Sequence, residues 1–357
     1  MKLLIITQKI DVNDDLLGFM HGWVREFAKH FESIIVITLG VGEYHLPDNV
    51  RVLSLGKENL EVGVWNLGFF KKLKYGFIFF SYIWRYRNEY DGVLVHMNKE
   101  YMALGGLFWR LWGKKAALWY NHGAGNIISV LAGCLAQKIF CTSPFSFFAK
   151  WSKTSLMPAG IDTEIFRQNE NIQSVKKSIL FLSRLSPIKG AHILIKAANL
   201  LDRESVNFLL NIVGEAGEKD KEYFEKLKDS AKELEQKGKI KFWGKIANYK
   251  TPEIYNQNEI VVNLTNSGSF DKIILEAMAC EKPILVCNKS FLEILPDNLS
   301  QVLFFEEGNA ADLKNKLTAF LNEPQKTAAG KQLRAIVQKK HSLVFLSQKL
   351  FDFFCSD

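Results

Sequence analysis

The sequence lacks any cluster of cysteine or histidine residues that would indicate a disulfide framework or a metal site. Its five cysteines form no Cys-x-x-Cys pair, and their odd number argues against systematic disulfide pairing. No group of His, Asp and Glu residues has the spacing of metal ligands. We therefore expect a protein of a reducing compartment that holds no metal.

Several common nucleotide and nucleophile motifs are also missing. Residues 8–15, which follow the first predicted strand, contain no Gly-x-Gly-x-x-Gly, so a dinucleotide cofactor has no support. The sequence has neither a Gly-x-Ser-x-Gly elbow nor a Gly-x-x-x-x-Gly-Lys-Ser/Thr phosphate loop. It also has no uncharged window long enough for a membrane-spanning helix, and the apolar run at residues 3–6 is too short for a signal-peptide core. We expect a cytoplasmic protein without a cofactor.

Acidic residues are absent from residues 62–88, within a chain of 357 residues whose net charge is +8. This segment interleaves five basic side chains with many aromatic ones. We predict a helix that contacts an anionic membrane surface from the inner face. A core helix with a solvated basic rim is an open alternative. Nucleic acid would also suit basic and aromatic groups, but no nucleic-acid motif occurs, so we expect no such partner.

The length of the chain and its apolar periodicity predict two domains, because one core seldom serves this many residues. Apolar, β-branched runs alternate with helical spacing in both halves. Residues 167–177 are polar and lack periodicity, as a linker would. We predict two doubly wound α/β domains over 1–165 and 166–335, followed by a terminal helix over 336–357. In the first domain we expect strands at residues 2–7, 34–39, 50–53, 92–96, 115–120, 138–141 and 155–157.

Residues 263–283 read as a strand end, a Ser/Gly loop and the start of a helix near Asp271. In open α/β sheets ligands bind beyond the carboxyl ends of the strands, where the next helix favours an anion. Lys272 and Glu276 would share one face of this helix. A lysine at this end opposes the helix dipole, so its presence indicates a bound phosphate.

Other turns carry groups that suit a phosphate. Arg184 and Lys189 flank a proline turn directly after a predicted strand, and a planar fork beside a point charge suits a diphosphate. Alone, this pair also fits a solvated loop. Glycines after two later strands allow close backbone approach. They are Gly214, Gly217 and Gly244.

His122 follows a predicted strand and precedes Gly-Ala-Gly, which indicates an open loop. A lone histidine is more often a structural hydrogen-bonding group than a catalyst. We favour the structural interpretation for His21, and it stays open for His96.

Taken together, these motifs resemble glycosyltransferase family four. The match in order and spacing is to the donor-binding half of that family, in residues 181–190 (FLSRLSPIKG), 212–217 (IVGEAG), 241–244 (KFWG) and 275–279 (LEAMA). Residues 158–162 (PAGID) look like its inter-domain segment, and residues 119–123 (WYNHG) match more loosely. The resemblance covers nearly the whole chain, most specifically after residue 158.

The resemblance implies the GT-B fold, in which two Rossmann-like domains face each other across a cleft and the last helix crosses back to the first domain. The acceptor would bind residues 1–165 and the donor residues 166–335. The implied activity is a retaining, metal-independent transfer from a UDP- or GDP-linked sugar. The basic aromatic segment adds the expectation of a glycan or lipid-linked acceptor, such as a polysaccharide precursor, at the cytoplasmic membrane face.

The resemblance also implies roles for single residues. Arg184 and Lys189 would hold the donor diphosphate and neutralise its charge as it leaves. Glu276 would hydrogen-bond the ribose hydroxyls, and His122 would face the transferred sugar. The backbone near Lys245 and Ile246 would meet the base. The expected donor-binding residues are Gly214, Gly217, Gly244, Lys245, Ile246, Gly268, Ser269, Phe270, Asp271 and Lys272.

The chain departs from the family's pattern at Gly268, where the family usually has a glutamate, so the carboxylate that would bind the sugar hydroxyls is missing. Asp271 and Lys272 stand where it more often has glycine and an apolar residue. We predict that Asp271 partly replaces the missing acid and that Lys272 contacts a phosphate. One alternative is a surface pair of Lys272 with Glu276, worth about 0.3 kcal/mol. Another is a sugar-nucleotide-binding protein that has lost turnover.

Overall fold

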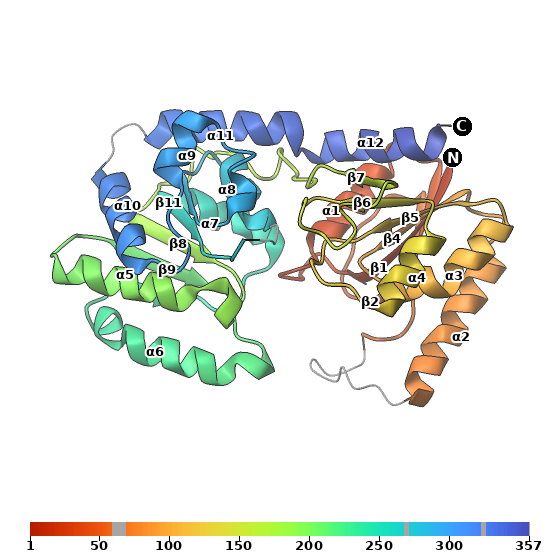
Figure 1. The fold of residues 1–357 in the computed structure, drawn as a ribbon, viewed down its shortest axis with the longest axis horizontal. Helices are drawn as coiled ribbons and strands as arrows, with labels where there is room; N and C mark the ends of the chain where they lie inside the picture. The colour runs from red at the N-terminus through yellow and green to blue at the C-terminus, as the bar shows by residue number, and fades with distance from the viewer. Residues whose placement is uncertain (59–68, 268–270, 323–325, 357) are drawn as a thin grey trace. The chain divides into compact units, whose positions relative to one another are not determined.

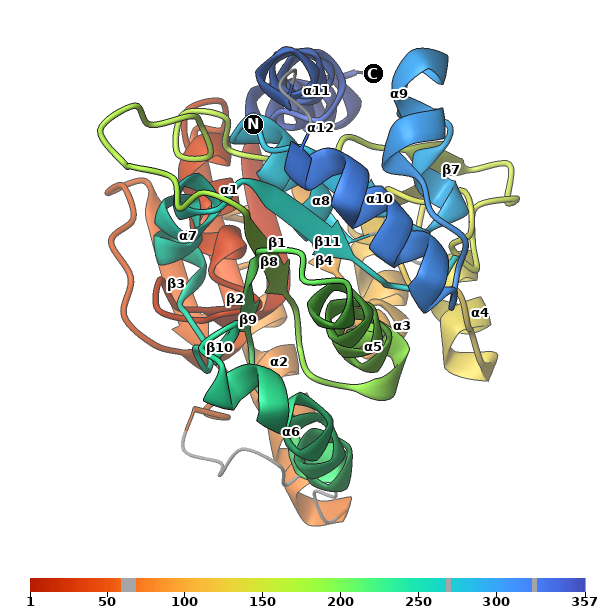
Figure 2. The same cartoon turned by 90° about the vertical axis from the view of Figure 1, so that its left-hand side faces the viewer.

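The computed structural model describes residues 1–58, 69–267, 271–322 and 326–356. Its contacts divide the chain into two compact units, each with one parallel sheet (Figures 1 and 2). Unit 1 comprises Met1–Gly160, Ala247–Tyr249 and Leu343–Asp357. Unit 2 comprises Ile161–Ile246 and Lys250–Ser342.

Unit 1 is built on a seven-stranded sheet of order β3-β2-β1-β4-β5-β6-β7. Its central strand β1 pairs in parallel with β2 and β4, so that Leu3 stands opposite Ile34 on one side and Gly92 on the other. The strands are β1 (Lys2–Ile10), β2 (Ser33–Val41), β3 (Val50–Ser54), β4 (Gly92–His96), β5 (Lys115–Trp119), β6 (Lys138–Cys141) and β7 (Thr154–Leu156). The helices are α1 (Phe19–Phe27), α2 (Phe69–Arg85), α3 (Lys99–Leu111), α4 (Ile127–Leu135) and α12 (Leu343–Cys355).

Alternate residues of β1 enter two separate cores, one on each face of the sheet. Leu4 and Ile6 pack in the core that α2, α3 and α4 cover. Leu3 and Ile5 pack in the core that α1 and α12 cover. Both faces of a parallel sheet are normally buried, which is why its strands read as continuous apolar runs in the sequence.

Unit 2 is built on a five-stranded parallel sheet of order β10-β9-β8-β11-β12. Its helix α5 packs against both α6 and α10 (Figure 2). The strands are β8 (Ser178–Leu182), β9 (Leu209–Val213), β10 (Ile240–Phe242), β11 (Ile260–Asn263) and β12 (Ile284–Val286). The α-helices are α5 (Ala191–Arg203), α6 (Lys221–Gln236), α7 (Thr251–Gln257), α8 (Lys272–Ala279), α9 (Asp297–Leu303), α10 (Ala310–Asn322) and α11 (Lys326–Lys340). Short 3-10 turns occur at Pro187–Lys189, Glu218–Asp220, Asn248–Lys250 and Lys289–Phe291.

The basic aromatic segment of residues 62–88 is only partly described, because residues 59–68 lie outside the described residues. The remainder contains α2, whose Tyr75, Phe79 and Ile83 are buried in the unit 1 core. Phe77 and Trp84 of the same helix are exposed. One side of α2 therefore packs into the core, and its outer side exposes apolar residues. A search of the described residues finds no helix with the length and hydropathy needed to cross a membrane.

Candidate functional site

The candidate donor-binding residues of unit 2 lie beyond the carboxyl ends of four neighbouring strands. Carboxyl ends of parallel strands meet at one edge of a sheet, so residues far apart in the sequence come together there. They are Arg184 and Lys189 after β8, Gly214 and Gly217 after β9, Gly244, Lys245 and Ile246 after β10, and Asp271, Lys272 and Glu276 after β11. Gly268, Ser269 and Phe270 lie outside the described residues.

Backbone hydrogen bonds join the loops after β8, β9 and β10. The N–H of Gly214 donates to the carbonyl of Gly244 at 2.8 Å, and the N–H of Leu185 donates to the carbonyl of Glu215 at 2.9 Å. Gly214 has φ +132°, and a Cβ there would lie 1.9 Å from the carbonyl oxygen of Ser183. Only glycine fits at this junction, and the close approach fixes the backbone at the edge of the site.

Lys189 is held by a buried acid. Its Nζ lies 2.8 Å from Asp271 Oδ2 and 3.1 Å from Thr265 Oγ1. The same carboxylate oxygen accepts hydrogen bonds from Thr265 Oγ1 at 2.9 Å and Asn263 Nδ2 at 3.1 Å. Burial alone would raise the pKa of Asp271, but Lys189 and these hydrogen bonds lower it below its usual value. The carboxylate is therefore ionised and aimed at the proposed phosphate-binding lysine.

Glu276 lies in the interior of unit 2, where it is only 5% exposed. The buried Tyr255 donates a hydrogen bond from its hydroxyl to Glu276 Oε2 at 2.9 Å. Burial, reinforced by this carboxylate, raises the pKa of Tyr255 well above its usual value. Tyr255 therefore acts as a fixed donor that orients Glu276.

Lys272 and Glu276 occupy successive turns of α8, and Lys272 Nζ is buried. This excludes the surface pair that the sequence left open. Burial, partly offset by the Glu276 carboxylate, lowers the pKa of Lys272 to about 7. At neutral pH the side chain lies close to the midpoint of its titration, so a phosphate placed beside it would favour the charged form.

A carboxylate from another loop reaches the position next to Gly268. Glu307 Oε2 accepts hydrogen bonds from the N–H of Ser267 at 3.2 Å and from its hydroxyl at 3.0 Å. The hydroxyl oxygen of Ser267 also accepts the N–H of Lys289 at 3.0 Å. Glu307 lines a cavity of about 510 Å³. Its other lining residues are Lys289, Phe304, Glu306, Asp312 and Lys316.

His122 lies in unit 1, in the loop between β5 and α4. The residue is exposed, and its ring centroid lies 5.3 Å from that of Tyr120 in an edge-to-face contact. Partial burial of the ring and the nearby Lys99 ammonium lower the pKa of His122. The ring is therefore neutral at pH 7 and presents one donor and one acceptor nitrogen.

The other two histidines singled out from the sequence are buried. His21 Nε2 accepts the backbone N–H of His45 at 3.0 Å, which agrees with a structural role. His96 packs among aromatic rings, with its centroid 5.7 Å from that of Trp23.

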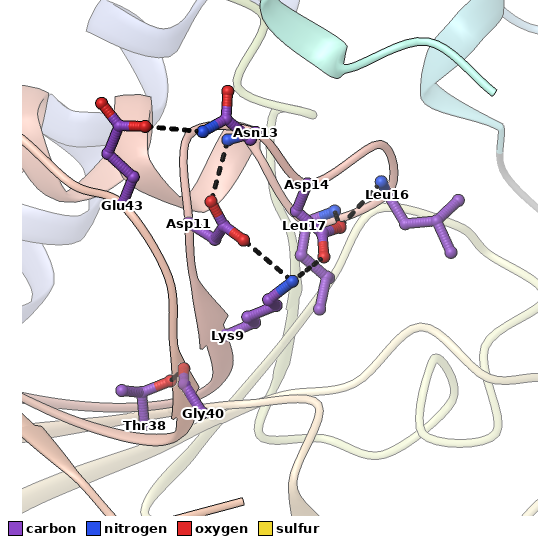
Figure 3. A network of polar contacts seen from close by, with 9 residues as sticks. All are labelled: Lys9, Asp11, Asn13, Asp14, Leu16, Leu17, Thr38, Gly40 and Glu43. Carbon is purple, nitrogen blue, oxygen red and sulfur yellow. Dashed lines mark hydrogen bonds and ion pairs between the residues drawn. The ribbon is translucent and has the colours of Figure 1, made fainter. Parts of the chain in front are cut away.

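The loop after β1 in unit 1 is closed by its own side chains (Figure 3). Lys9 Nζ lies 2.9 Å from Asp11 Oδ2 and 2.8 Å from Asp14 Oδ2. Asp14 Oδ1 accepts the backbone N–H groups of Leu16 and Leu17 at 2.9 and 2.7 Å. Burial would raise the pKa of Asp14, but Lys9 and these N–H groups lower it. In a glycine-rich phosphate loop, backbone N–H groups bind the anion. Here the N–H groups of Leu16 and Leu17 already donate to Asp14.

A comparison with known protein families matches the part of the chain that carries this candidate site. Residues 162–339, which include every donor-binding candidate of unit 2, match the family described as Glycosyl transferases group 1. The chain belongs to the group 1 glycosyltransferases. The predicted resemblance to glycosyltransferase family four is thereby confirmed.

Individual relatives of this glycosyltransferase are distant. It is 24% identical over 160 residues to D-inositol 3-phosphate glycosyltransferase of Segniliparus rotundus, covering 42% of this chain and 35% of that one. It is 27% identical over 144 residues to an uncharacterized 41.2 kDa protein in the cps region of Klebsiella pneumoniae, covering 40% of this chain and 37% of that one. Each match thus spans about a third of the curated relative.

Among solved structures, the HepE protein of Anabaena in complex with UDP and glucose matches with a TM-score of 0.78 and 19% identity, over 100% of both chains. This likeness confirms the predicted GT-B fold of two α/β units with parallel sheets.

Three residues that support the candidate site were not predicted. Asn263 and Thr265 hold the Asp271 carboxylate, and Tyr255 holds Glu276. The sequence carries a signal for the first two, because they interrupt the apolar run of a buried strand at its carboxyl end. Tyr255 has no such signal, since a tyrosine in a short helix is compatible with simple packing.

Proposed function

We propose that this glycosyltransferase moves a sugar, with retention of configuration, from a nucleotide sugar to a lipid-linked or polysaccharide-precursor acceptor. The proposal rests on the observation that Arg184, Lys189, Lys272 and Glu276 all follow the carboxyl ends of two neighbouring strands of the unit 2 sheet. The HepE complex with UDP and glucose supports a nucleotide-linked donor. For this chain we propose a sugar linked to UDP or GDP. The Klebsiella relative in the cps region supports a polysaccharide product.

In this proposal the cations of unit 2 bind the donor diphosphate. When the bond between the sugar and the diphosphate breaks, negative charge grows on the leaving phosphate. Arg184 and Lys189 offset that charge, and the N-terminus of α8 adds its dipole. Lys272 contributes a third charge once the phosphate favours its protonated form. Fixed cations can supply this stabilisation without a metal, so we expect a chelator to leave the rate unchanged.

The nucleoside would be held by the groups around these cations. Glu276, oriented by Tyr255, accepts hydrogen bonds from the ribose hydroxyls. Gly214, Gly217 and Gly244, with the backbone near Lys245 and Ile246, meet the nucleotide at close range. Gly268, Ser269 and Phe270 complete the proposed donor-binding set.

His122 is proposed to act on the transferred sugar. Its neutral ring can both donate and accept a hydrogen bond at pH 7. We expect His122→Ala to lower kcat while leaving nucleotide affinity unchanged, because the nucleotide contacts belong to unit 2. Donor binding by a protein without any turnover, unchanged by His122→Ala, would instead favour a sugar-nucleotide-binding protein.

The acceptor side of the proposal rests on unit 1. We propose that the enzyme works as a peripheral protein at the inner face of the cytoplasmic membrane, which it contacts through residues 62–88. An acceptor carried on a lipid would be presented at that surface.

The test is transfer of labelled sugar from a panel of UDP- and GDP-linked donors into a lipid extract. Label in the organic phase, lost in Lys189→Ala, would support the proposal. NMR of the product would show the anomeric configuration. Transfer with inversion would contradict the retaining mechanism, and donor hydrolysis without any lipid product would favour a soluble glycan acceptor.

A further inference from the structure

Helices α2, α3 and α4 form a layer over one face of the unit 1 sheet (Figure 1). Trp84 of α2 packs edge-to-face on Trp112 at the end of α3, with ring centroids 5.6 Å apart. A Cβ at Gly106 of α3 would lie 2.7 Å from Leu135 Cβ of α4, so those two helices touch closely. The three helices therefore present one continuous outer surface, which we call the α2–α4 surface.

The α2–α4 surface is apolar where a helix layer on a sheet is normally polar. Ile127 is 87% exposed, and Phe77 and Leu111 are each 73% exposed. Large exposed patches of this kind mark interaction sites more often than chance. The other exposed apolar residues of the three helices are Leu73, Trp84, Leu104, Leu107, Ile128, Val130 and Leu131.

Charge on these helices has a single sign apart from one residue. Helices α2 and α4 contain no Asp or Glu, and α3 contains only Glu100 in its first turn. The sequence has no acidic residue from 101 to 161, just as it has none from 62 to 88. The basic residues of the 101–161 segment are Arg110, Lys114, Lys115, Lys138, Lys150 and Lys153. A surface that is both apolar and basic complements an anionic lipid headgroup layer.

The most exposed apolar residue of this surface, Ile127, lies beside the His122 loop. Helix α4 begins at Ile127, five residues after His122, and its first turns expose Ile127, Ile128 and Leu131. Asn126 and Ser129 cap this end in a reciprocal capping box. Lys99 Nζ, from the start of α3, bonds to both caps at 3.1 and 3.0 Å. The apolar end of α4 is thus rigidly fixed next to the proposed catalytic histidine.

We propose that the α2–α4 surface docks on an anionic bilayer and that Ile127, Ile128 and Leu131 of α4 enter its acyl boundary. This inference rests on the proposed function, because it names the element that would bring the His122 loop to a lipid-linked acceptor. A second copy of the chain is a poorer occupant. A symmetric dimer through this surface would place its basic side chains against each other.

The test is co-sedimentation of the full chain with neutral phosphatidylcholine vesicles and with vesicles that also contain phosphatidylglycerol. We expect the wild type to bind the anionic vesicles and the double variant Ile127→Ser/Ile128→Ser to bind at least about tenfold more weakly. The control is Val344→Ser on α12, an aliphatic position that is 60% exposed on the opposite face of the unit 1 sheet, which should bind like the wild type. Circular dichroism would show that each variant is folded.

The outcomes separate this inference from the proposed function. Equal binding by the wild type and the double variant would overturn the role of α4 but leave a membrane location intact. No vesicle binding by the wild type would overturn both the docking surface and the peripheral location. A UDP-induced rise in melting temperature would still report the donor site. A dimer in light scattering that the double variant abolishes, without vesicle binding, would identify a second copy as the occupant.

Discussion

At the residue scale, three ionisable groups of the proposed donor site are withdrawn from water. Asp271 and Glu276 are buried carboxylates, and each is held by named partners. Lys272 Nζ is buried in the same region. Buried charges are costly unless paired, so several of them at one sheet edge support the proposed binding role of this site.

Lys272 makes the stability of the free protein depend on pH. Its pKa is about 7 in the folded state against a usual value of 10.5. Between these values the unfolded chain binds more protons than the folded one, so the free energy of unfolding rises with pH across this window. Urea unfolding from about pH 6 to 9 should show that rise. In Lys272→Met the rise should be smaller, because this lysine no longer contributes, while Lys196→Met on α5 should keep the full rise. An unchanged slope in Lys272→Met would contradict this account of the lysine.

The same lysine should couple nucleotide binding to pH. A bound diphosphate favours the charged ammonium, so binding takes up a proton above pH 7. We expect UDP affinity to fall as the pH rises from about 7 to 9, and to fall less in Lys272→Met. Isothermal titration in two buffers of different ionisation enthalpy would measure the proton uptake. Equal uptake in both proteins would rule out a phosphate contact for Lys272.

Asp271 should stabilise the free protein by holding Lys189. Asp271→Asn leaves that ammonium without its counter-ion, so we expect a loss of about 3 kcal/mol in the free energy of unfolding. UDP should restore part of this loss by supplying the missing negative charge. The sugar-hydroxyl role predicted from the sequence gives a different result, because the variant would then bind UDP normally and UDP-sugar weakly. Melting curves with each ligand distinguish the two.

At the element scale, the fold was more predictable than the site. Inner strands such as β2, β4 and β11 are visible in the sequence because both of their faces are mostly buried and their residues are mostly apolar. The pairing of Lys189 with Asp271 was not predictable, since it joins loops 82 residues apart through side-chain positions that no periodicity encodes. The turn positions of the cations could be inferred, but their counter-ions could not.

The loops after β8 and β9 depend on one glycine. In Gly214→Ala the new Cβ would meet the carbonyl oxygen of Ser183 at a positive φ. We expect a loss of at least about 2 kcal/mol in stability and a weaker response to UDP. Gly217→Ala is the matched control, because the nearest atom to its Cβ would be 4.0 Å away. Thermal melts of both variants measure the difference in stability. Equal stability of the two variants would contradict a close approach between Gly214 and the Ser183 carbonyl that only glycine allows.

At the scale of the whole molecule, the chain combines two α/β units that carry different proposed roles. Unit 2 carries the diphosphate-binding candidates, and its residues match the glycosyltransferase family. Unit 1 carries His122 and the α2–α4 surface, with α12 packed into its second core. This division predicts that nucleotide binding survives changes to the α2–α4 surface.

The most direct test of the central claim is the melting temperature of the full chain with UDP, GDP and ADP at equal concentrations. A ligand that binds only the folded state stabilises it by about 2.7 kcal/mol at a hundredfold excess over its Kd. For a unit of this size that corresponds to a rise of about 5–10 °C. We predict such a rise with UDP or GDP, and its loss in Lys189→Ala. No change with any of the three nucleotides would contradict the account.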